Sequence, residues 1–303
     1  MLDLRRLRLL SELSRRGTIA EVARVAGYTP SAVSQALAQL ERQTGTALLE
    51  RDGRRVRLTP AAHGLVARTE RALAELDAAE AELAAEHESV RGEIVIGAFP
   101  SAAAGLVVPA VAEMSERHPQ LVASVREHEP EDGIQLLRSG ELDLLVSERY
   151  EEVEPAPAGG LESTLLMSEP LLLVLPRGDE RRAPVALEAL AEEAWIAGLA
   201  GTQFAAALEQ ACRAAGFPPR VVHRADDALL FQALVAEGAG IGLLPALACT
   251  GSDAVRFAEI AAPAPPQRHI DALARRAAAR RPALAAALEA LRNAARARPA
   301  RAP

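Results

Sequence analysis

The N-terminal segment most constrains the fold, because it carries a helix start or stop signal every few residues. Leucines recur at helical spacing between residues 4 and 13, and Gly17 is placed to end that helix as a C-cap. The next four residues, Thr18-Ile-Ala-Glu21, form a capping box, so we expect a second helix to begin at once and to end near Ala26. Gly27-Tyr28 then predicts a tight turn.

A third helix is predicted from about residue 30 to residue 43. Thr29 is a good N-cap, and Pro30 occupies the first helical position, where its missing N–H costs nothing. Two helices joined by a short glycine-containing turn form a helix-turn-helix. The apolar face of the third helix is Val33, Leu37 and Leu40, and the opposite face carries Ser31, Ser34, Gln35, Ala38 and Gln39. Small and amide side chains at such a helix N-terminus can approach base edges, and its free N–H groups can bind phosphate.

An arginine-rich hairpin is predicted directly after the third helix. Asp52-Gly53 is a hairpin turn signal between short strands, and four arginines lie within residues 51–57. Next to a helix-turn-helix, such a hairpin is typical of a wing that lies along a nucleic-acid backbone. A three-helix core with a solvated hairpin and no ligand is the alternative. The candidate DNA-binding residues are Thr29, Pro30, Ser31, Ser34, Gln35, Gln39, Arg51, Arg54 and Arg55.

The charge is divided unevenly along the 303 residues. The net charge of −7 is composed of +5 in residues 1–66, −19 in residues 67–267 and +7 in residues 268–303. An acidic central region therefore carries a basic N-terminal region and a basic tail, which favours a nucleic-acid partner for the N-terminal region. The tail could add non-specific affinity for DNA.

A long helix is predicted from Pro60 to about Ser89, since this stretch is rich in Ala, Glu and Leu. A heptad register fits, with Val66, Leu73, Glu80 and His87 at one position and Thr69, Leu76, Leu83 and Val90 at the other. The apolar seam is interrupted at Glu80 and His87, so only a modest coiled coil is expected. Dimerisation is the favoured interpretation, and packing against the same chain is the alternative.

After residue 91 the pattern changes to short apolar runs that alternate with helical stretches, which predicts a mostly parallel sheet with helices on both faces. The predicted strands are 94–96, 121–126, 142–146, 171–175, 195–196, 221–222 and 241–244. The predicted helices are 101–117, 134–138, 186–193, 203–215 and 227–237. A further helix around Leu284, Leu288 and Leu291 is expected to cover this region, followed by a disordered tail after Asn293.

Ligands of such sheets bind beyond the strand ends, at helix N-termini. Several sequence positions match this rule, and the candidate effector-binding residues are Pro100, Ser101, Ser147, Thr202 and Gln203. Hydroxyls and helix-end N–H groups at Ser101 and Thr202 favour an anionic ligand such as a carboxylate. The alternative is that both residues are plain N-caps.

Other site chemistries find little support in the sequence. The six histidines show no metal-ligand spacing, and neither Cys212 nor Cys249 has a clear activating neighbour, so core or surface thiols are favoured over a redox pair. The acidic run 148–154 is interpreted as a solvated loop rather than a catalytic pair. No stretch is apolar enough to cross a membrane, and the N-terminus lacks a signal sequence. We therefore expect a cytoplasmic protein without catalytic residues, metal or cofactor.

The N-terminal segment resembles the winged helix-turn-helix of LysR-type transcriptional regulators. The resemblance is carried by Ala32-Val33-Ser34-Gln35, Leu40-Glu41, Thr44-Gly45, Leu48-Leu49-Glu50-Arg51 and Arg55-Val56-Arg57-Leu58-Thr59-Pro60-Ala61. Two positions depart from the family pattern, which has Phe in place of Leu49 and Gly in place of Ala62. The resemblance extends over nearly the whole chain, and it is least specific in the C-terminal region.

The resemblance implies an α/β multidomain protein in three parts. These are a winged helix-turn-helix DNA-binding domain (1–59), a linker and dimerisation helix (60–91), and an effector-binding domain (92–303) built like type 2 periplasmic binding proteins. Within the last, lobe I is 92–161 with 267–303, lobe II is 162–266, two crossing strands join the lobes, and a small molecule binds between them.

The implied function is sequence-specific regulation of transcription. A homodimer, or a tetramer as in most relatives, binds a short imperfect palindrome in double-stranded DNA and contacts RNA polymerase if it is an activator. A cytoplasmic solute-binding module with a protein-interaction domain, and an α/β enzyme, are the alternatives. The basic recognition face disfavours the first, and the absence of a nucleophile–base or metal set disfavours the second.

Overall fold

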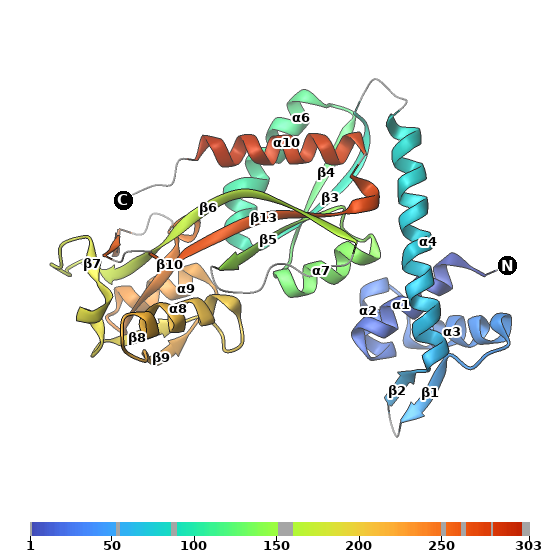
Figure 1. Cartoon of the computed structure of the whole chain (residues 1–303), viewed down its shortest axis with the longest axis horizontal. Coiled ribbons are helices and arrows are strands. Elements are labelled where there is room, and N and C mark those ends of the chain that lie inside the picture. Colours follow the sequence, from blue (N-terminus) through green and yellow to red (C-terminus); the bar gives the residue numbers. More distant parts are fainter. Residues whose placement is uncertain are drawn as a thin grey trace.

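The computed structural model describes residues 2–52, 55–85, 90–150, 160–249, 253–261, 265–279 and 281–298. A small N-terminal head and a long helix stand beside a larger body that contains a twisted sheet (Figure 1). None of the helices in these ranges is long and apolar enough to cross a bilayer.

The head contains three helices, α1 (Leu4–Arg16), α2 (Ile19–Ala26) and α3 (Pro30–Thr44). Each begins at a side-chain cap, because Asp3 accepts a hydrogen bond from Arg5 N–H, Thr18 from Glu21 N–H and Thr29 from Ala32 N–H. Each ends at a glycine in the left-handed conformation, which residues with a side chain rarely adopt. The predicted starts and ends of these helices therefore agree closely with the structure.

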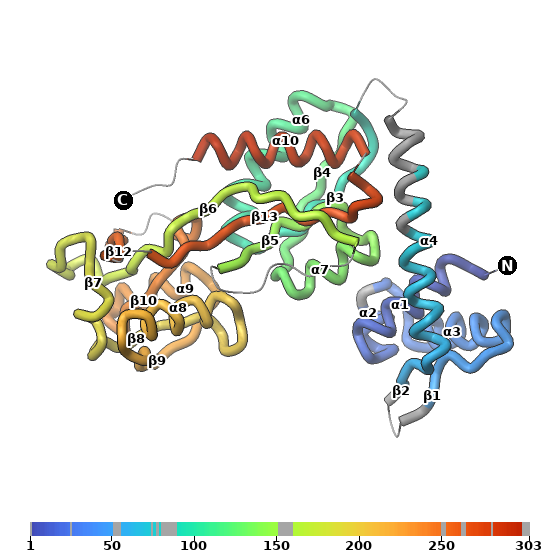
Figure 2. Tube along the Cα trace, viewed as in Figure 1, coloured from blue at the N-terminus to red at the C-terminus, as the bar shows by residue number. Residues whose placement is uncertain are grey.

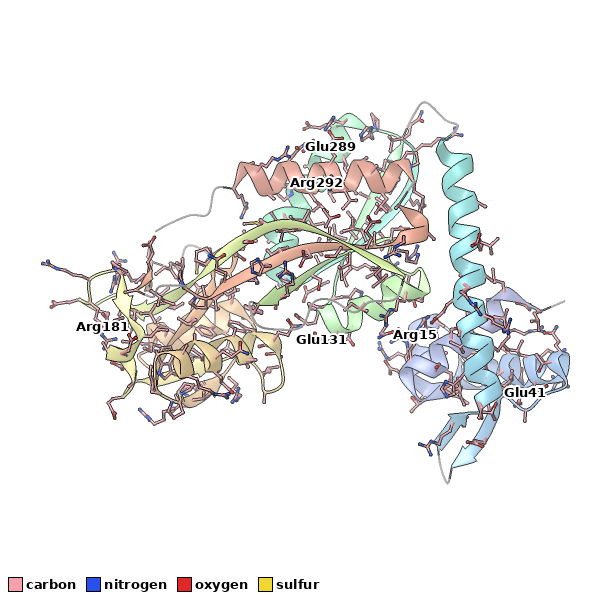
Figure 3. The ribbon with its side chains drawn as sticks, viewed as in Figure 1. Arg15, Glu41, Glu131, Arg181, Glu289 and Arg292 are labelled. Carbon is pink, nitrogen blue, oxygen red and sulfur yellow. The ribbon has the colours of Figure 1, made fainter. Side chains whose placement is uncertain are left out.

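A hairpin of β1 (Leu49–Asp52) and β2 (Arg55–Leu58) follows α3. Glu41 near the end of α3 anchors it, because its Oε1 accepts hydrogen bonds from the backbone N–H of Leu48 at 2.8 Å and of Leu49 at 3.0 Å (Figure 3). The predicted turn residue Gly53 lies outside the described residues. The hairpin is therefore fixed to the C-terminal half of the third helix.

The long helix α4 (Pro60–Ala85) packs partly against its own chain. Val66 lies in the core of the head, Leu73 is buried, and Arg15 of α1 pairs with Glu70 at 3.1 Å (Figure 3). Leu76 remains 48% exposed. The head thus covers the first turns of the heptad stripe. The side chains of Glu80, Leu83 and His87 lie outside the described set, and Val90, the last position, follows α4 and packs against the apolar core of the body.

The body is built on one nine-stranded sheet with the order β4-β3-β5-β13-β6-β10-β8-β9, and β11 pairs with β6. The strands are β3 (Gly92–Ala98), β4 (Leu121–Glu127), β5 (Leu144–Tyr150), β6 (Leu161–Pro176), β8 (Ala194–Ala197), β9 (Arg220–Arg224), β10 (Ile241–Pro245), β11 (Val255–Ala258) and β13 (Gln267–Arg275). Strands at both ends pair in parallel, but β13, β6, β10 and β11 pair antiparallel in the middle. The predicted mostly parallel sheet is therefore wrong, and the sheet is mixed.

Two long strands, β6 and β13, run side by side through the middle of the body (Figure 2). The first half of β6 pairs with β13, and its second half pairs with β10 and β11. They connect the half that contains β4, β3 and β5, which we call lobe I, to the half that contains β10, β8 and β9, which we call lobe II. The family resemblance implied two crossing strands between the lobes. The residue pattern, however, predicted only residues 171–175 of β6 and missed β13, because Arg268, Asp271 and Arg275 interrupt its apolar pattern.

Helices cover both faces of the sheet, each lobe with its own apolar core (Figure 1). In lobe I they are α5 (Pro100–Ala102), the π-turn η1 (Ala103–Val107), α6 (Val108–Arg117), α7 (Pro130–Ser139), the 3-10 turn η4 (Arg276–Ala278) and α10 (Pro282–Ala297). In lobe II they are the 3-10 turns η2 (Leu187–Leu190) and η3 (Ala246–Ala248), α8 (Gln203–Ala214) and α9 (Ala228–Ala236), beside the short strands β7 (Val185–Ala186) and β12 (Ile260–Ala261).

Three helix predictions need correction. The predicted helix 186–193 forms only the 3-10 turn η2 at Leu187–Leu190, and Ala186 belongs to the strand β7. The predicted helix 101–117 is interrupted by the π-turn, since Pro109 has no N–H to continue an α-helical hydrogen-bond ladder. The predicted disorder after Asn293 is wrong as far as Arg298, because α10 continues to Ala297 and buries Ala294 and Ala295 in the core of lobe I.

Candidate nucleic-acid interface and inter-lobe cleft

The outer face of α3 is polar and open. Thr29, Pro30, Ser31, Ser34 and Gln35 are exposed, whereas Val33, Leu37 and Leu40 are buried in the core of the head. Thr29 Oγ1 accepts a hydrogen bond from Ala32 N–H at 3.2 Å, which fixes the helix start. Gln39 is half-buried, and its Oε1 accepts a hydrogen bond from Arg42 Nε at 3.0 Å. The exposed N-terminal turns of α3 can therefore approach a groove.

The structure adds a residue to this face that the sequence analysis missed. Arg5, in the first turn of α1, donates a hydrogen bond from Nε to the Tyr28 hydroxyl at 2.6 Å and lies 4.9 Å from the centroid of the Tyr28 ring. Arg5 and Tyr28 line a surface hollow together with Gln35 and Gln39 of α3. A fixed cation thus borders the polar face. Arg5 is more than twenty residues before α3 in the sequence, so the sequence pattern did not indicate this contact.

The predicted arginines of the hairpin are placed only in part. Arg51 lies in β1 opposite Val56, and Arg55 lies in β2 opposite Asp52. Their side chains and the whole of Arg54 lie outside the described residues. The role of these three arginines stays a prediction.

In the body, a cavity of about 410 Å³ lies between the two lobes. Pro100 and Ser101 line it from lobe I, and Thr202 and Gln203 line it from lobe II. Ser147 is not part of the lining and is buried. The reason is that β5 continues to Tyr150, so Glu148 and Tyr150 share the face toward the cavity and Ser147 points to the other side of the strand.

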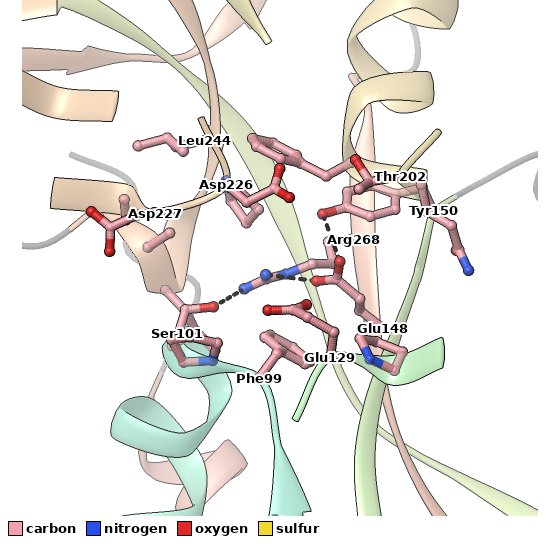
Figure 4. Close-up of a pocket in the computed structure, with 18 of the residues that line it drawn as sticks. Phe99, Ser101, Glu129, Glu148, Tyr150, Thr202, Asp226, Asp227, Leu244 and Arg268 are labelled. Carbon is pink, nitrogen blue, oxygen red and sulfur yellow. Dashed lines mark hydrogen bonds and ion pairs between the residues drawn. The ribbon is translucent and has the colours of Figure 1, made fainter. Parts of the chain in front are cut away.

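Arg268 of β13 lies at the base of this cleft (Figure 4). Its guanidinium donates from Nη1 to Glu148 at 2.9 Å, from Nε to Glu169 at 2.7 Å and from Nη2 to Ser101 Oγ at 3.1 Å. It also lies 4.9 Å from the centroid of the Phe99 ring. The side chain of Arg268 is 4% exposed and that of Glu169 is 1% exposed. Burial by itself would lower the pKa of Arg268, but Glu148 and Glu169 hold it above its usual value.

The hydroxyls and helix ends of the cleft are largely engaged within the protein. Thr202 Oγ1 accepts from Ala205 N–H at 3.1 Å and donates to the Leu199 carbonyl at 2.9 Å, so it is an N-cap of α8. Asp227 Oδ1 caps α9 by accepting from Leu230 N–H at 2.7 Å. For Thr202 the geometry favours the alternative of a plain N-cap over a ligand contact.

The lining of the cleft is acidic, which the sequence analysis did not foresee. Its carboxylates are Glu129, Glu131, Glu148, Asp226 and Asp227, and Arg268 is the cation among the described lining residues. Partial desolvation in the cleft raises the pKa of Glu129 to about 7 although the residue remains exposed, and Glu148, Asp226 and Glu131 add to this shift by repulsion. Burial also raises the pKa of Glu148. The charge of the lining therefore does not support the predicted anionic ligand.

The two cysteines lie in environments that suppress reactivity. Cys212 is fully buried, and Cys249 is half-buried under η3, with its thiol donating to the Pro245 carbonyl at 3.5 Å. Burial raises the pKa of each thiol to about 12. Both cysteines are therefore thiols, not thiolates, at neutral pH, as structural cysteines are.

Family comparisons cover both parts of the chain. Residues 4–63 match the family described as bacterial regulatory helix-turn-helix protein, lysR family, and residues 87–296 match the LysR substrate binding domain. A probable hydrogen peroxide-inducible genes activator of Streptomyces viridosporus is 31% identical over 96% of this chain and 95% of its own length. The transcriptional dual regulator GltC of Bacillus subtilis is 26% identical over 80% of this chain and 81% of its own length.

Solved structures with the same fold include full-length regulators. A full-length OxyR variant from Pseudomonas aeruginosa has a TM-score of 0.70 at 20% identity, with 96% of this chain and 98% of that chain covered. CbnR in complex with its target DNA has a TM-score of 0.57 at 21% identity, with 96% and 99% covered. The chain therefore belongs to the LysR family of transcriptional regulators, with a helix-turn-helix DNA-binding domain and an effector-binding domain.

Proposed function

We propose that this regulator binds a short imperfect palindrome through two copies of α3, each inserted into a major groove. The observation that carries the proposal is the exposed N-terminal half of α3, where Ser31, Ser34 and Gln35 lie on a helix that carries no acidic residue before Glu41. Such side chains pair with base edges, and Arg5 beside them can contact the backbone. The arginines of the β1–β2 hairpin would hold the flanking phosphates.

The protein would act as a homodimer or a dimer of dimers, paired through α4. The exposed Leu76 supports this proposal, and Leu83 continues its apolar stripe in the sequence, although Val66 and Leu73 are already covered by the same chain. Half-sites one helical turn apart then require two heads related by symmetry. Because the partner is DNA, we place the protein in the cytoplasm, with RNA polymerase as a further partner if it activates transcription.

A small molecule in the inter-lobe cleft would control this binding. The cleft is lined from both lobes, and β6 and β13 are the strands that pass between them. A ligand that contacts both lobes changes their closure, and closure changes how the bodies of an oligomer arrange the heads. No step of this mechanism requires catalysis.

The DNA-contact proposal is tested by Ser34→Glu, which places a carboxylate against the base edges and phosphates. We expect affinity for DNA from upstream of its own gene to fall about a hundredfold, since a base contact contributes ~1–3 kcal/mol and repulsion adds to its loss. Fluorescence anisotropy with labelled DNA measures this. Ser115→Glu, at an exposed serine of α6 in the body, is the matched control. Equal affinity of Ser34→Glu and the control would contradict the proposal.

Peroxide sensing is a second function to weigh, because several relatives are named as probable hydrogen peroxide-inducible genes activators. Oxidation of a cysteine by peroxide requires a thiolate that solvent can reach. Cys212 is fully buried and both thiols have a pKa of about 12, so the cysteines do not favour this function. A bound effector remains the proposed signal.

A further inference from the structure

The inter-lobe cleft contains hydrogen-bond acceptors that have no donor partner within the described part of the protein. Among the described residues, the carboxylates of Glu129 and Glu131 form no ion pair or hydrogen bond. Asp226 accepts one hydrogen bond, from Leu199 N–H at 2.8 Å, and has a second oxygen to spare. Gln203 Oε1 is buried in the wall and also has no partner. A ligand that fits this site must therefore supply donors.

The cation of the lining is not free to meet a ligand carboxylate. Arg268 bonds to Glu148, Glu169 and Ser101, and its ring contact with Phe99 covers one face of the guanidinium. Drawing it away would leave Glu169, which is 1% exposed, as an unpaired buried charge. An anionic ligand would therefore meet five carboxylates without a cation available to pair with it.

The acidic groups lie on both sides of the cleft. Glu129 occupies the N-cap position of α7 in lobe I without a side-chain cap hydrogen bond, and Asp226 precedes α9 in lobe II (Figure 4). The two charges are close enough for Asp226 to raise the pKa of Glu129, so they repel each other across the gap. This repulsion opposes closure of the lobes. A positive charge between Glu129 and Asp226 converts it into attraction.

The chemistry of the walls points to an organic cation and not to a metal ion. No group of three or more His, Cys, Asp or Glu residues within the described part of the chain could hold a metal. The remaining wall is apolar and aromatic, with Phe99, Phe204, Leu244 and Leu247. Aromatic rings also attract cations through their faces. A cavity of about 410 Å³ has room for an apolar body behind a charged group.

We infer that the effector of this cleft is an organic cation, an amine or guanidinium group on an apolar body, held between Glu129 of lobe I and Asp226 of lobe II. The inference rests on the proposed function of the cleft as the effector site, and it specifies the chemical class of that effector. Binding draws the lobes together, because the cation pairs with a carboxylate from each. The free protein is then the open form and the bound protein the closed form.

The test uses the full-length protein and three probes that share a phenyl ring and a two-carbon spacer: phenethylamine, 2-phenylethanol and 3-phenylpropanoate. Isothermal titration calorimetry gives the three dissociation constants. We expect the amine to bind at least about tenfold more tightly than the carboxylate, with the alcohol between them, because the probes differ mainly in charge. Mg²⁺ is the fourth titrant. It is added to the protein alone and to the complex with the amine, and it should not displace the amine.

Two variants locate the effect. Glu129→Gln and Asp226→Asn each remove a charge while keeping the shape of the side chain. Each should weaken amine binding about fivefold and reduce the difference in affinity between phenethylamine and 3-phenylpropanoate. Glu188→Gln, at an exposed carboxylate of η2 outside the cleft, is the matched control and should change nothing. Thermal denaturation of each variant shows that it is folded.

The outcomes separate this inference from the proposed function. Tighter binding of the carboxylate, displacement by Mg²⁺, unchanged amine affinity in both cleft variants, or no amine binding at millimolar concentration overturns the cationic class. Specific DNA binding measured on the same preparation tests the regulator itself. If the protein binds its DNA but prefers the carboxylate probe, the proposed function as an effector-controlled regulator is retained and only the inference of a cationic effector is rejected.

Discussion

The head and the cleft build their polar surfaces in opposite ways. The proposed DNA-contact face comes mainly from one continuous helix, α3, whose exposed N-terminal turns lie within residues 29–35, with Arg5 of α1 beside them. The residues that line the cleft come from α5, α7, β5, α8, α9, β10 and β13. The first and the last of these residues are more than a hundred positions apart in the sequence. A face of the first kind depends on local caps, and a site of the second kind depends on the packing of two lobes.

The polar groups of the two regions also differ in their surroundings. In the head, the caps Thr18 and Thr29 are exposed, so water can replace each bond that is lost. In the cleft, Arg268 and Glu169 are almost fully buried, and no solvent can replace either partner. Equal chemical changes should therefore cost much more in the cleft than in the head.

The largest expected effect is that of Arg268→Met. Removal of the guanidinium leaves Glu169 and Glu148 without their cation, which should lower the free energy of unfolding of the body by ~3–5 kcal/mol. Urea denaturation followed by the fluorescence of Trp195, the single tryptophan and a core residue of lobe II, measures it. Adding Glu169→Gln should restore part of the loss. A loss of unfolding free energy below about 1 kcal/mol would make the cleft cluster no more important for stability than an exposed helix cap, and would contradict the comparison.

A smaller effect is expected in the head from Thr18→Ala. It removes the cap in which Thr18 Oγ1 accepts from Glu21 N–H at 3.3 Å, so the head should lose ~0.5–2 kcal/mol of stability. Far-ultraviolet circular dichroism during denaturation reports the helices, while Trp195 should report no change in the body. Thr46→Ala, at an exposed threonine whose hydroxyl makes only a long 3.4 Å hydrogen bond to the Thr44 carbonyl, is the control. A loss as large as that of Arg268→Met would break the contrast between the regions.

Glu129→Gln should have a small, pH-dependent effect. The pKa of Glu129 is raised to about 7 in the folded protein by burial and by Glu148, Asp226, Glu131 and Glu127, with the cation of Arg268 already paired. Stability from the protonated form is therefore present at pH 4 and is lost as the pH rises through 7. The variant should melt about 1–2 °C above the parent at pH 8, because the site is partly exposed, and equal to it at pH 4. A lower melting temperature at pH 8 would contradict the repulsion across the cleft.

No effect is expected from hydrogen peroxide at modest excess. Both thiols have a pKa of about 12, so neither Cys212 nor Cys249 offers a thiolate near pH 7. Mass spectrometry of the intact protein and DNA-binding assays before and after treatment check this. Oxidation of a cysteine accompanied by a change in DNA affinity would restore peroxide sensing as a candidate function.

Much of the fold could be predicted because its signals are local. The capping box at Thr18 and the Thr29-Pro30 start fix α2 and α3, and the apolar run at 241–244 marks β10. The family resemblance implied a pair of crossing strands, but the residue pattern did not reveal β13, because its buried Arg268 and Asp271 look like surface residues until their partners are known. Part of the cleft lining, at Pro100, Ser101, Thr202 and Gln203, follows from strand ends.

The sequence by itself determined the order of elements in the head, the polar face of α3 and the family, since each rests on residues a few positions apart. Only the tertiary structure decided the charge of the cleft. Glu129, Glu148 and Asp226 are separated along the chain, and two crossing strands bring them to one cavity while Arg268 is taken up by Glu148 and Glu169. Charge interactions depend on distance in space and on burial, and neither quantity is written in the local sequence.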